Sequence, residues 1–145
     1  MKYIGYEREE EAELWARKEL KLDAAPSFFR ALSAVDDNGD FVCVVVMTNF
    51  TPRNIDLNIV MSCKKVRPKG LIRMFNEVFG LLFNQLRIPR VTGLVRASNA
   101  RSKRAVERFG FKLEGVMRKA FDHDEDLHIY GFLAEEFKQH AWCRG

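Results

Sequence analysis

Three elements that follow one another between Ile55 and Leu86 restrict the folds open to this chain. Apolar residues occupy every second position of the stretch Ile55–Ser62, which predicts a strand with one strongly apolar face. The loop Cys63–Gly70 comes next, and from Leu71 onward the apolar residues recur at helical spacing. A strand, a loop and a long helix in this order leave backbone N–H groups free at the start of the helix, and such a site binds phosphate.

The loop before this helix is basic and contains glycine. Its cationic residues are Lys64, Lys65, Arg67 and Lys69. They add long-range attraction for a pyrophosphate or a ribose phosphate, and Gly70 lets the backbone come close to such a ligand. An ordinary solvated basic loop explains the same residues without any ligand.

Hydrophobic periodicity and turn signals predict the other elements. Asn38-Gly39 between two β-prone runs is the strongest short-range signal for a hairpin. Ser98 or Asn99 can cap a short polar helix that Gly110 ends. These signals predict a helix over Glu7–Leu20, strands over Phe28–Val35, Phe41–Phe50 and Ile55–Ser62, a helix over Leu71–Leu86, a strand over Arg90–Arg96, a helix over Asn99–Arg108, and strands over Phe111–Phe121 and Leu127–Leu133.

The composition fits a single domain over residues 1–145. Of the 145 residues, 47% are hydrophobic, enough for a core that needs no disulfide or metal. The longest apolar run, Phe41–Met47, is far shorter than the roughly 20 residues that span a bilayer, and the N-terminus lacks a signal-peptide core. We therefore expect a cytoplasmic protein that does not enter a membrane.

Cysteine content and net charge indicate which kinds of ligand and partner the chain can bind. Cys43, Cys63 and Cys143 are widely spaced and include no Cys-x-x-Cys pair, so the sequence predicts neither a disulfide framework nor a metal site. Lys and Arg exceed Asp and Glu by 24 to 20, a net charge of +4. This excess suits a polyanionic partner, whether a nucleic acid, an acidic protein or a nucleotide cofactor.

A series of motifs in the second half of the chain carries a family resemblance. Asn99-Ala100-Arg101-Ser102 starts the short helix, and Phe109–Phe111, Leu113–Gly115 and Arg118 follow in one continuous stretch. This series resembles the Asn-x-x-Ser, Gly-Phe, Glu-Gly and Arg motifs of the GNAT superfamily, in its ribosomal-protein N-terminal acetyltransferase branch. Arg67–Ile72 resembles the Gln/Arg-x-x-Gly-x-Gly/Ala pyrophosphate loop of that superfamily, and Ile72 departs from its last position.

The resemblance implies a fold, a reaction and a set of contacts. The implied fold is α/β (α+β), a single mixed and mostly antiparallel sheet flanked by helices. The implied reaction moves an acetyl group from acetyl-CoA, the co-substrate, to a primary amine by direct attack. The strand Ile55–Ser62 is expected to splay from Arg90–Arg96 and to bind the pantetheine arm in the gap. The implied cofactor contacts are Ile59, Val60, Met61, Arg67, Lys69, Gly70, Leu71, Asn99 and Ser102.

Ser102 and His123 are the predicted catalytic residues. The resemblance places Ser102 near the cofactor sulfur, where its hydroxyl would hydrogen-bond the departing thiolate; a plain exposed helix serine is the alternative. Val106 stands where many related enzymes have a tyrosine, and Phe121 stands where a glutamate base often follows. Histidine is a residue type that can accept a proton near neutral pH, so His123 is the candidate base for deprotonation of the amine. A solvated acidic turn, with no dedicated base, explains the same segment.

Other functions and the acceptor stay open. Ile72, Phe121 and a short N-terminal region favour a GNAT-fold protein without catalysis, a binding or structural subunit of a larger assembly. Nucleic-acid binding rests only on the basic excess, which the phosphates of coenzyme A explain as well. The acidic segments Glu7–Leu20 and Phe121–Leu127 favour a cationic acceptor such as a protein N-terminus, a lysine or a polyamine. Homo-oligomers are compatible with the sequence.

Overall fold

The computed structural model describes residues 1–20, 29–62 and 68–139. Its strands are β1 (Lys2–Gly5), β2 (Phe29–Val35), β3 (Phe41–Thr48), β4 (Asn54–Met61), β5 (Arg90–Arg96), β6 (Lys112–Phe121) and β7 (Glu125–Leu133). Its helices are α1 (Glu9–Leu20), α2 (Pro68–Phe79), which continues into a π-helical segment over Gly80–Gln85, α3 (Ala100–Arg108) and α4 (Ala134–Gln139). A single 3₁₀ turn over Asp122–Asp124 joins β6 to β7 within these ranges.

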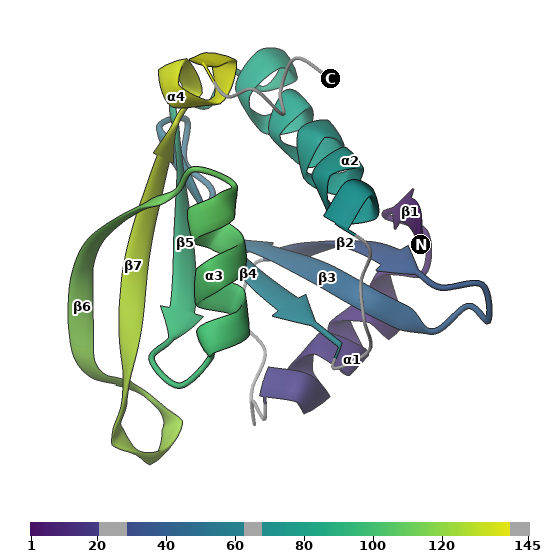
Figure 1. Ribbon diagram of the computed structural model, residues 1–145, viewed down its shortest axis with the longest axis horizontal. Helices are drawn as coiled ribbons and strands as arrows, with labels where there is room; N and C mark the ends of the chain where they lie inside the picture. Colours follow the sequence, from purple (N-terminus) through teal and green to yellow (C-terminus); the bar gives the residue numbers. More distant parts are fainter. Residues whose placement is uncertain (21–28, 63–67, 140–145) are drawn as a thin grey trace.

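The strands form one sheet in the order β1-β2-β3-β4-β5-β7-β6. All neighbours are antiparallel except β4 and β5, which are parallel. The parallel pair requires a crossover connection, and α2 supplies it. The prediction of a mixed, mostly antiparallel sheet flanked by helices is therefore confirmed (Figure 1).

The predicted β2–β3 hairpin is present. The carboxylate of Asp36 accepts hydrogen bonds from the backbone N–H groups of Asn38 and Asp40, at 2.9 and 3.0 Å. Gly39 has φ of 81°, a left-handed conformation that glycine adopts without a steric penalty. The side chain of Asp36 thus stabilises the tight turn at which the chain reverses.

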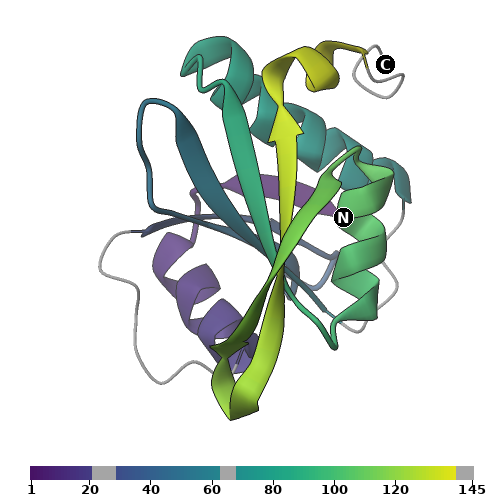
Figure 2. The ribbon, with the colours of Figure 1, turned by 90° about the vertical axis from the view of Figure 1, so that its left-hand side faces the viewer.

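Helices cover both faces of the sheet (Figure 2). On one face, Ala12 and Ala16 of α1 pack against a small cluster that includes Val44 and Val60. On the other face, α2 and α3 bury a larger core, and several aromatic rings lie within 6 Å of the ring of Phe79; they belong to Phe75, Phe83, Phe111, Phe132 and Phe137. Each such side chain contributes about 1.5–3 kcal/mol by leaving water, and together they hold α2 and α4 on the sheet.

Two elements were not predicted from the sequence, and one predicted helix differs in form. β1 pairs only with β2 at the edge of the sheet, and α4 follows β7 directly. The helix predicted over Leu71–Leu86 begins at Pro68 and changes to π-helical geometry at Gly80. In the three described ranges, the structure contains no helix long and apolar enough to cross a membrane.

Candidate active site between β4 and β5

The parallel strands β4 and β5 separate halfway along their length. Their pairing runs from Asn54 with Arg90 to Leu57 with Gly93 and then ends. β4 remains paired with β3 as far as Met61. Among the described residues, the second half of β4 therefore has no strand beside one of its edges, and Figure 1 shows the ends of β4 and β5 diverging next to α3. The predicted splay is present.

The direction of the backbone decides which residues face this gap. The N–H of Ser62 donates to the carbonyl of Val42 in β3, at 3.0 Å. Backbone groups in a strand point to alternate sides, so those of Val60 also point to β3 and those of Ile59 and Met61 point to the gap. Val60 was predicted as a contact for the cofactor together with its two neighbours, but its own N–H and carbonyl lie on the wrong edge of the strand.

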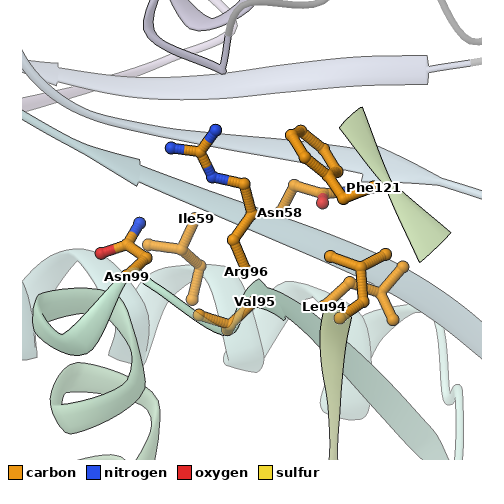
Figure 3. A pocket seen from close by; sticks show the side chains of 8 residues that line it. Asn58, Ile59, Leu94, Val95, Arg96, Asn99 and Phe121 are labelled. Atoms are coloured by element: carbon orange, nitrogen blue, oxygen red, sulfur yellow. The ribbon is translucent and has the colours of Figure 1, made fainter. Parts of the chain in front are cut away.

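A small cavity of about 40 Å³ lies where the strands part (Figure 3). It is lined by Asn58, Ile59, Leu94, Val95, Arg96, Asn99, Phe121 and Leu127. These residues come from both strands, from the start of α3 and from the β6–β7 hairpin. In the described parts of the chain, no carboxylate, imidazole or thiol is among them. The cavity can therefore orient groups by hydrogen bonding and by one positive charge.

Asn99 has the capping role that the sequence allows. It is the N-cap of α3, and its side-chain oxygen accepts a hydrogen bond from the N–H of Ser102 at 3.1 Å. Its side chain also lines the cavity. Within the described residues, the amide nitrogen of Asn99 has no hydrogen-bond partner, so one end of this amide caps the helix and the other end is available to a ligand.

Ser102 lies inside the protein. Only 2% of its surface is exposed, and its hydroxyl is 3.4 Å from the carbonyl oxygen of Ile59. The alternative of a plain exposed helix serine is therefore wrong. At 3.4 Å the hydrogen bond is longer than the usual 2.5–3.0 Å and weak, so the hydroxyl can turn to a better partner. Val106, one turn further along α3, is buried in the core.

Three contacts fix α3 over the gap. Ser102 meets Ile59 in β4, the Arg101 guanidinium donates to the carbonyl of Ser62, and the Tyr130 hydroxyl donates to Glu107 at 2.9 Å. Burial and this carboxylate raise the pKa of Tyr130 to about 12. These contacts link α3 to β4 and to β7, and they keep Asn99 at the mouth of the gap.

The β6–β7 hairpin contributes apolar groups to the cavity, namely Phe121 and Leu127. His123 is at the exposed tip of this hairpin, with φ of 60°, and does not line the cavity. Its role as a base stays a prediction. The pKa of Glu125 lies below its ordinary value because hydrogen bonds from Ser98 stabilise the carboxylate, with a further contribution from the positive charge of Arg96.

The predicted phosphate site lies partly outside the described residues, since Arg67 falls there. Lys69 and Gly70 belong to the first turn of α2 and not to a loop. A Cβ on Gly70 would come within 3.3 Å of the side chain of Met1. The glycine was expected to leave space for a ligand close to the backbone, but Met1 fills that space. The backbone N–H groups of Lys69 and Gly70, in this first turn, have no partner within the helix, and the contact predicted for Leu71 stays a prediction. Ile72 is 37% exposed.

Sequence reasoning missed Arg96 and Asn58 as residues of the cavity. Both belong to predicted strands, at positions that face away from the core under α2 and α3. Arg96 ends its predicted strand only three positions before Asn99, and this proximity to the Asn-x-x-Ser motif was the signal available. In the ranges that the structure describes, no group of His, Cys, Asp and Glu side chains could hold a metal ion.

No protein-family model and no curated protein matches the sequence. Solved structures do match. A dodecameric spermidine N-acetyltransferase from Vibrio cholerae aligns over 91% of this chain and 78% of its own, with 16% identity and a TM-score of 0.65. A GNAT-family acetyltransferase from Bacillus anthracis aligns over 73% and 67%, with 17% identity and a TM-score of 0.61. Likeness at this level of identity establishes the architecture, and this chain has the fold of the GNAT acetyltransferases.

Proposed function

We propose that this protein is an N-acyltransferase that moves an acetyl group from acetyl-CoA to a primary amine by direct attack. The observation that carries the proposal is the unpaired edge of β4 at Ile59 and Met61, beside the free amide nitrogen of Asn99. The transfer forms one nitrogen–carbon bond, breaks one carbon–sulfur bond and moves one amine proton to the departing sulfur. It requires no covalent enzyme intermediate.

The residues present fit an extended, amide-bearing ligand that ends in phosphates. Ile59 and Met61 offer backbone groups to the pantetheine arm as an added strand would use them. The Asn99 amide nitrogen adds a donor at the start of α3. The first turn of α2, with Lys69, offers free N–H groups and a positive charge for phosphate. Both helices cover the same face of the sheet (Figure 2).

When bound, acetyl-CoA supplies an activated acyl thioester. The N–H of Ile59 or Met61 would donate to the acyl oxygen, where negative charge develops, and a preorganised donor there lowers the barrier. The hydroxyl of Ser102 would donate a hydrogen bond to the departing sulfur. Because no carboxylate or imidazole of the described residues lines the cavity, we propose that the amine loses its proton through water or arrives neutral.

The acceptor is a primary amine, and three classes are open: a protein N-terminus, a lysine or a small amine. The acidic first turn of α1 gives little support to a cationic acceptor, because Glu9 is paired with Arg30 and Glu11 with Arg8. One similar structure is a dodecameric spermidine N-acetyltransferase. By analogy, we propose that this chain also forms homo-oligomers.

The competing function is a GNAT-fold binding subunit without catalysis. No carboxylate or imidazole among the described cavity residues can accept a proton from the amine, and Phe121 stands where such a base is expected, which favours this function. Calorimetry with acetyl-CoA and an assay of thiol release over a broad amine panel separate the two. We expect saturable binding, a higher melting temperature and amine-dependent thiol release. Binding of acetyl-CoA without thiol release would support the binding subunit. Absence of binding would show that acetyl-CoA is neither a substrate nor a ligand of this protein.

A further inference from the structure

Arg96 is the one charged side chain among the described residues that line the cavity between β4 and β5. Figure 3 shows its guanidinium extending from β5 to a position beside the ring of Phe121. The guanidinium carbon lies 5.1 Å from the centre of the Phe121 ring. The ring supports one side of the guanidinium and leaves its N–H edges to other partners.

The Nε donor of Arg96 is buried, and in the described part of the chain it has no hydrogen-bond partner. Among the described residues, one carboxylate oxygen of Glu125 lies 4.0 Å from this Nε, beyond hydrogen-bond distance. The other oxygen of Glu125 accepts from the N–H of Ser98 at 2.7 Å, which holds this carboxylate in its place. A buried guanidinium donor without an acceptor is costly, and a ligand that accepts from it removes that cost.

Arg96 also lies on the face of the sheet opposite α2 and α3. In β5, Val91 and Val95 belong to the core under those helices. Side chains of a strand alternate between faces, so Arg96 and Leu94 point to the other side. The features proposed to bind acetyl-CoA, the start of α2 and Asn99, are on the helix side. An amine that enters the gap from the face opposite the proposed cofactor site therefore meets Arg96.

We propose that Arg96 binds a carboxylate of the acceptor, which makes the acceptor an amino acid or a similar amine with a carboxylate close to the nitrogen. This inference rests on the proposed acyl transfer and names its substrate class. A guanidinium binds a carboxylate through two parallel hydrogen bonds, which fixes the orientation of the ligand as well as its position. The apolar neighbours Leu94, Phe121 and Leu127 suit an acceptor with an apolar side chain.

The charge around Arg96 favours a carboxylate over a phosphate. Glu125 lies 4.0 Å from the guanidinium, so the local positive charge is already partly balanced. A ligand with one negative charge meets less repulsion from Glu125 than a doubly charged phosphate does. In the described ranges, no lysine and no second arginine lines this cavity.

The test compares acceptors that differ only in the carboxylate. The common L-amino acids and their α-amides are assayed for thiol release with wild type, Arg96→Gln and the control Arg53→Gln. Arg53 is exposed and precedes β4 at the end where the strands are still paired, so its replacement makes the same charge change far from the gap. We expect the best amino acid to exceed its amide in kcat/KM by roughly tenfold or more, and Arg96→Gln to reduce this ratio roughly ten- to a hundredfold. Arg53→Gln should preserve the ratio.

A binding measurement keeps the inference separate from catalysis. Calorimetry with N-acetyl-L-leucine and its amide, each with coenzyme A present, should show tighter binding of the acid to wild type and loss of that difference in Arg96→Gln. Acetylation of amines with no preference for a carboxylate would overturn the role of Arg96 and leave acyl transfer standing. A third outcome is that wild type binds the acid more tightly than the amide, that Arg96→Gln abolishes this difference, and that wild type shows no turnover. This outcome would reject acyl transfer and retain the carboxylate site. A preference unchanged in Arg96→Gln would overturn the inference.

Discussion

The side-chain oxygen of Asn99 accepts a hydrogen bond from the backbone N–H of Ser102 at 3.1 Å, so the residue that lines the cavity also caps α3. The two predicted roles of Asn99, capping and contact with a ligand, involve opposite ends of the same amide. A substitution that preserves one end and removes the other can therefore separate them.

Asn99→Ser and Asn99→Ala make that separation. Serine is a good N-cap and alanine is not, so Asn99→Ala should lower the free energy of unfolding by about 1 kcal/mol and Asn99→Ser by much less. Both variants lack the amide nitrogen, and both should lose acetyl-CoA affinity by roughly two- to tenfold. Urea unfolding and calorimetry measure the two effects. Wild-type affinity in Asn99→Ser would show that the amide nitrogen does not touch the cofactor.

Lys69→Gln tests the phosphate end of the site. Lys69 is exposed in the first turn of α2, so its charge is not needed for folding. We expect a severalfold loss of acetyl-CoA affinity that shrinks as salt is added, because salt screens the attraction between exposed charges. Lys18→Gln, on α1 at the other face of the sheet, makes the same charge change and should have no effect. Equal losses in both variants would point to net charge and not to a phosphate site.

Local patterns predicted most of the elements because these carry their own periodicity. β5 has the predicted bounds of Arg90–Arg96, and the alternation in Ile55–Ser62 matches the burial of Ile55, Leu57 and Ile59 in β4. β1 was missed because its four residues, Lys2–Gly5, are too short to show an alternation, and its pairing with β2 is a long-range contact. α4 has only six residues and is held by the burial of Phe137 among aromatic rings, a tertiary effect.

The candidate site was predictable where a motif exists and not where it depends on packing. The Asn-x-x-Ser motif located Asn99 and Ser102, but not the burial of Ser102 against Ile59. Which edge of β4 carries the free backbone groups depends on the register with β3, and Val60 was included for that reason. The contact of Gly70 with Met1 joins residues far apart in the sequence, and no local pattern indicates it.

Glu125 should contribute a pH-dependent part of the stability. Its pKa is lowered in the folded protein, chiefly by hydrogen bonds from Ser98, so the folded state favours the ionised carboxylate. A lowered pKa stabilises the fold above the unfolded value of about 4.5, and this contribution is lost as the pH falls through the folded value. The loss of unfolding free energy in Glu125→Gln relative to wild type should therefore be larger near pH 7 than near pH 3.

Urea unfolding at several pH values measures that difference. Glu135→Gln, at an exposed position in α4, is the matched control, and its difference from wild type should stay nearly constant. A Glu125→Gln difference that does not change with pH would mean that the hydrogen bonds of Ser98 do not favour the ionised form.

Ser102→Ala tests the mechanism itself. The hydroxyl lies 3.4 Å from the Ile59 carbonyl in β4, on the strand edge proposed to bind the cofactor arm, and Val106 leaves no tyrosine to replace it. If Ser102 hydrogen-bonds the departing sulfur, turnover should fall roughly ten- to a thousandfold, as for the loss of one transition-state hydrogen bond, while acetyl-CoA affinity changes little. The long hydrogen bond to Ile59 is weak, so the melting temperature should fall only slightly.

The decisive assay measures thiol release for wild type, Ser102→Ala and Ser98→Ala on any accepted amine, with cofactor titrations alongside. Ser98 is exposed and precedes α3, so its replacement removes a hydroxyl near the site without touching the α3–β4 contact. Loss of a contact that forms only in the transition state lowers kcat without changing cofactor affinity. Ser102→Ala should therefore have a lower kcat than Ser98→Ala, and the two variants should have the same affinity for the cofactor. Equal turnover in Ser102→Ala and wild type would exclude Ser102 from the chemistry and leave it as the residue that packs α3 against Ile59.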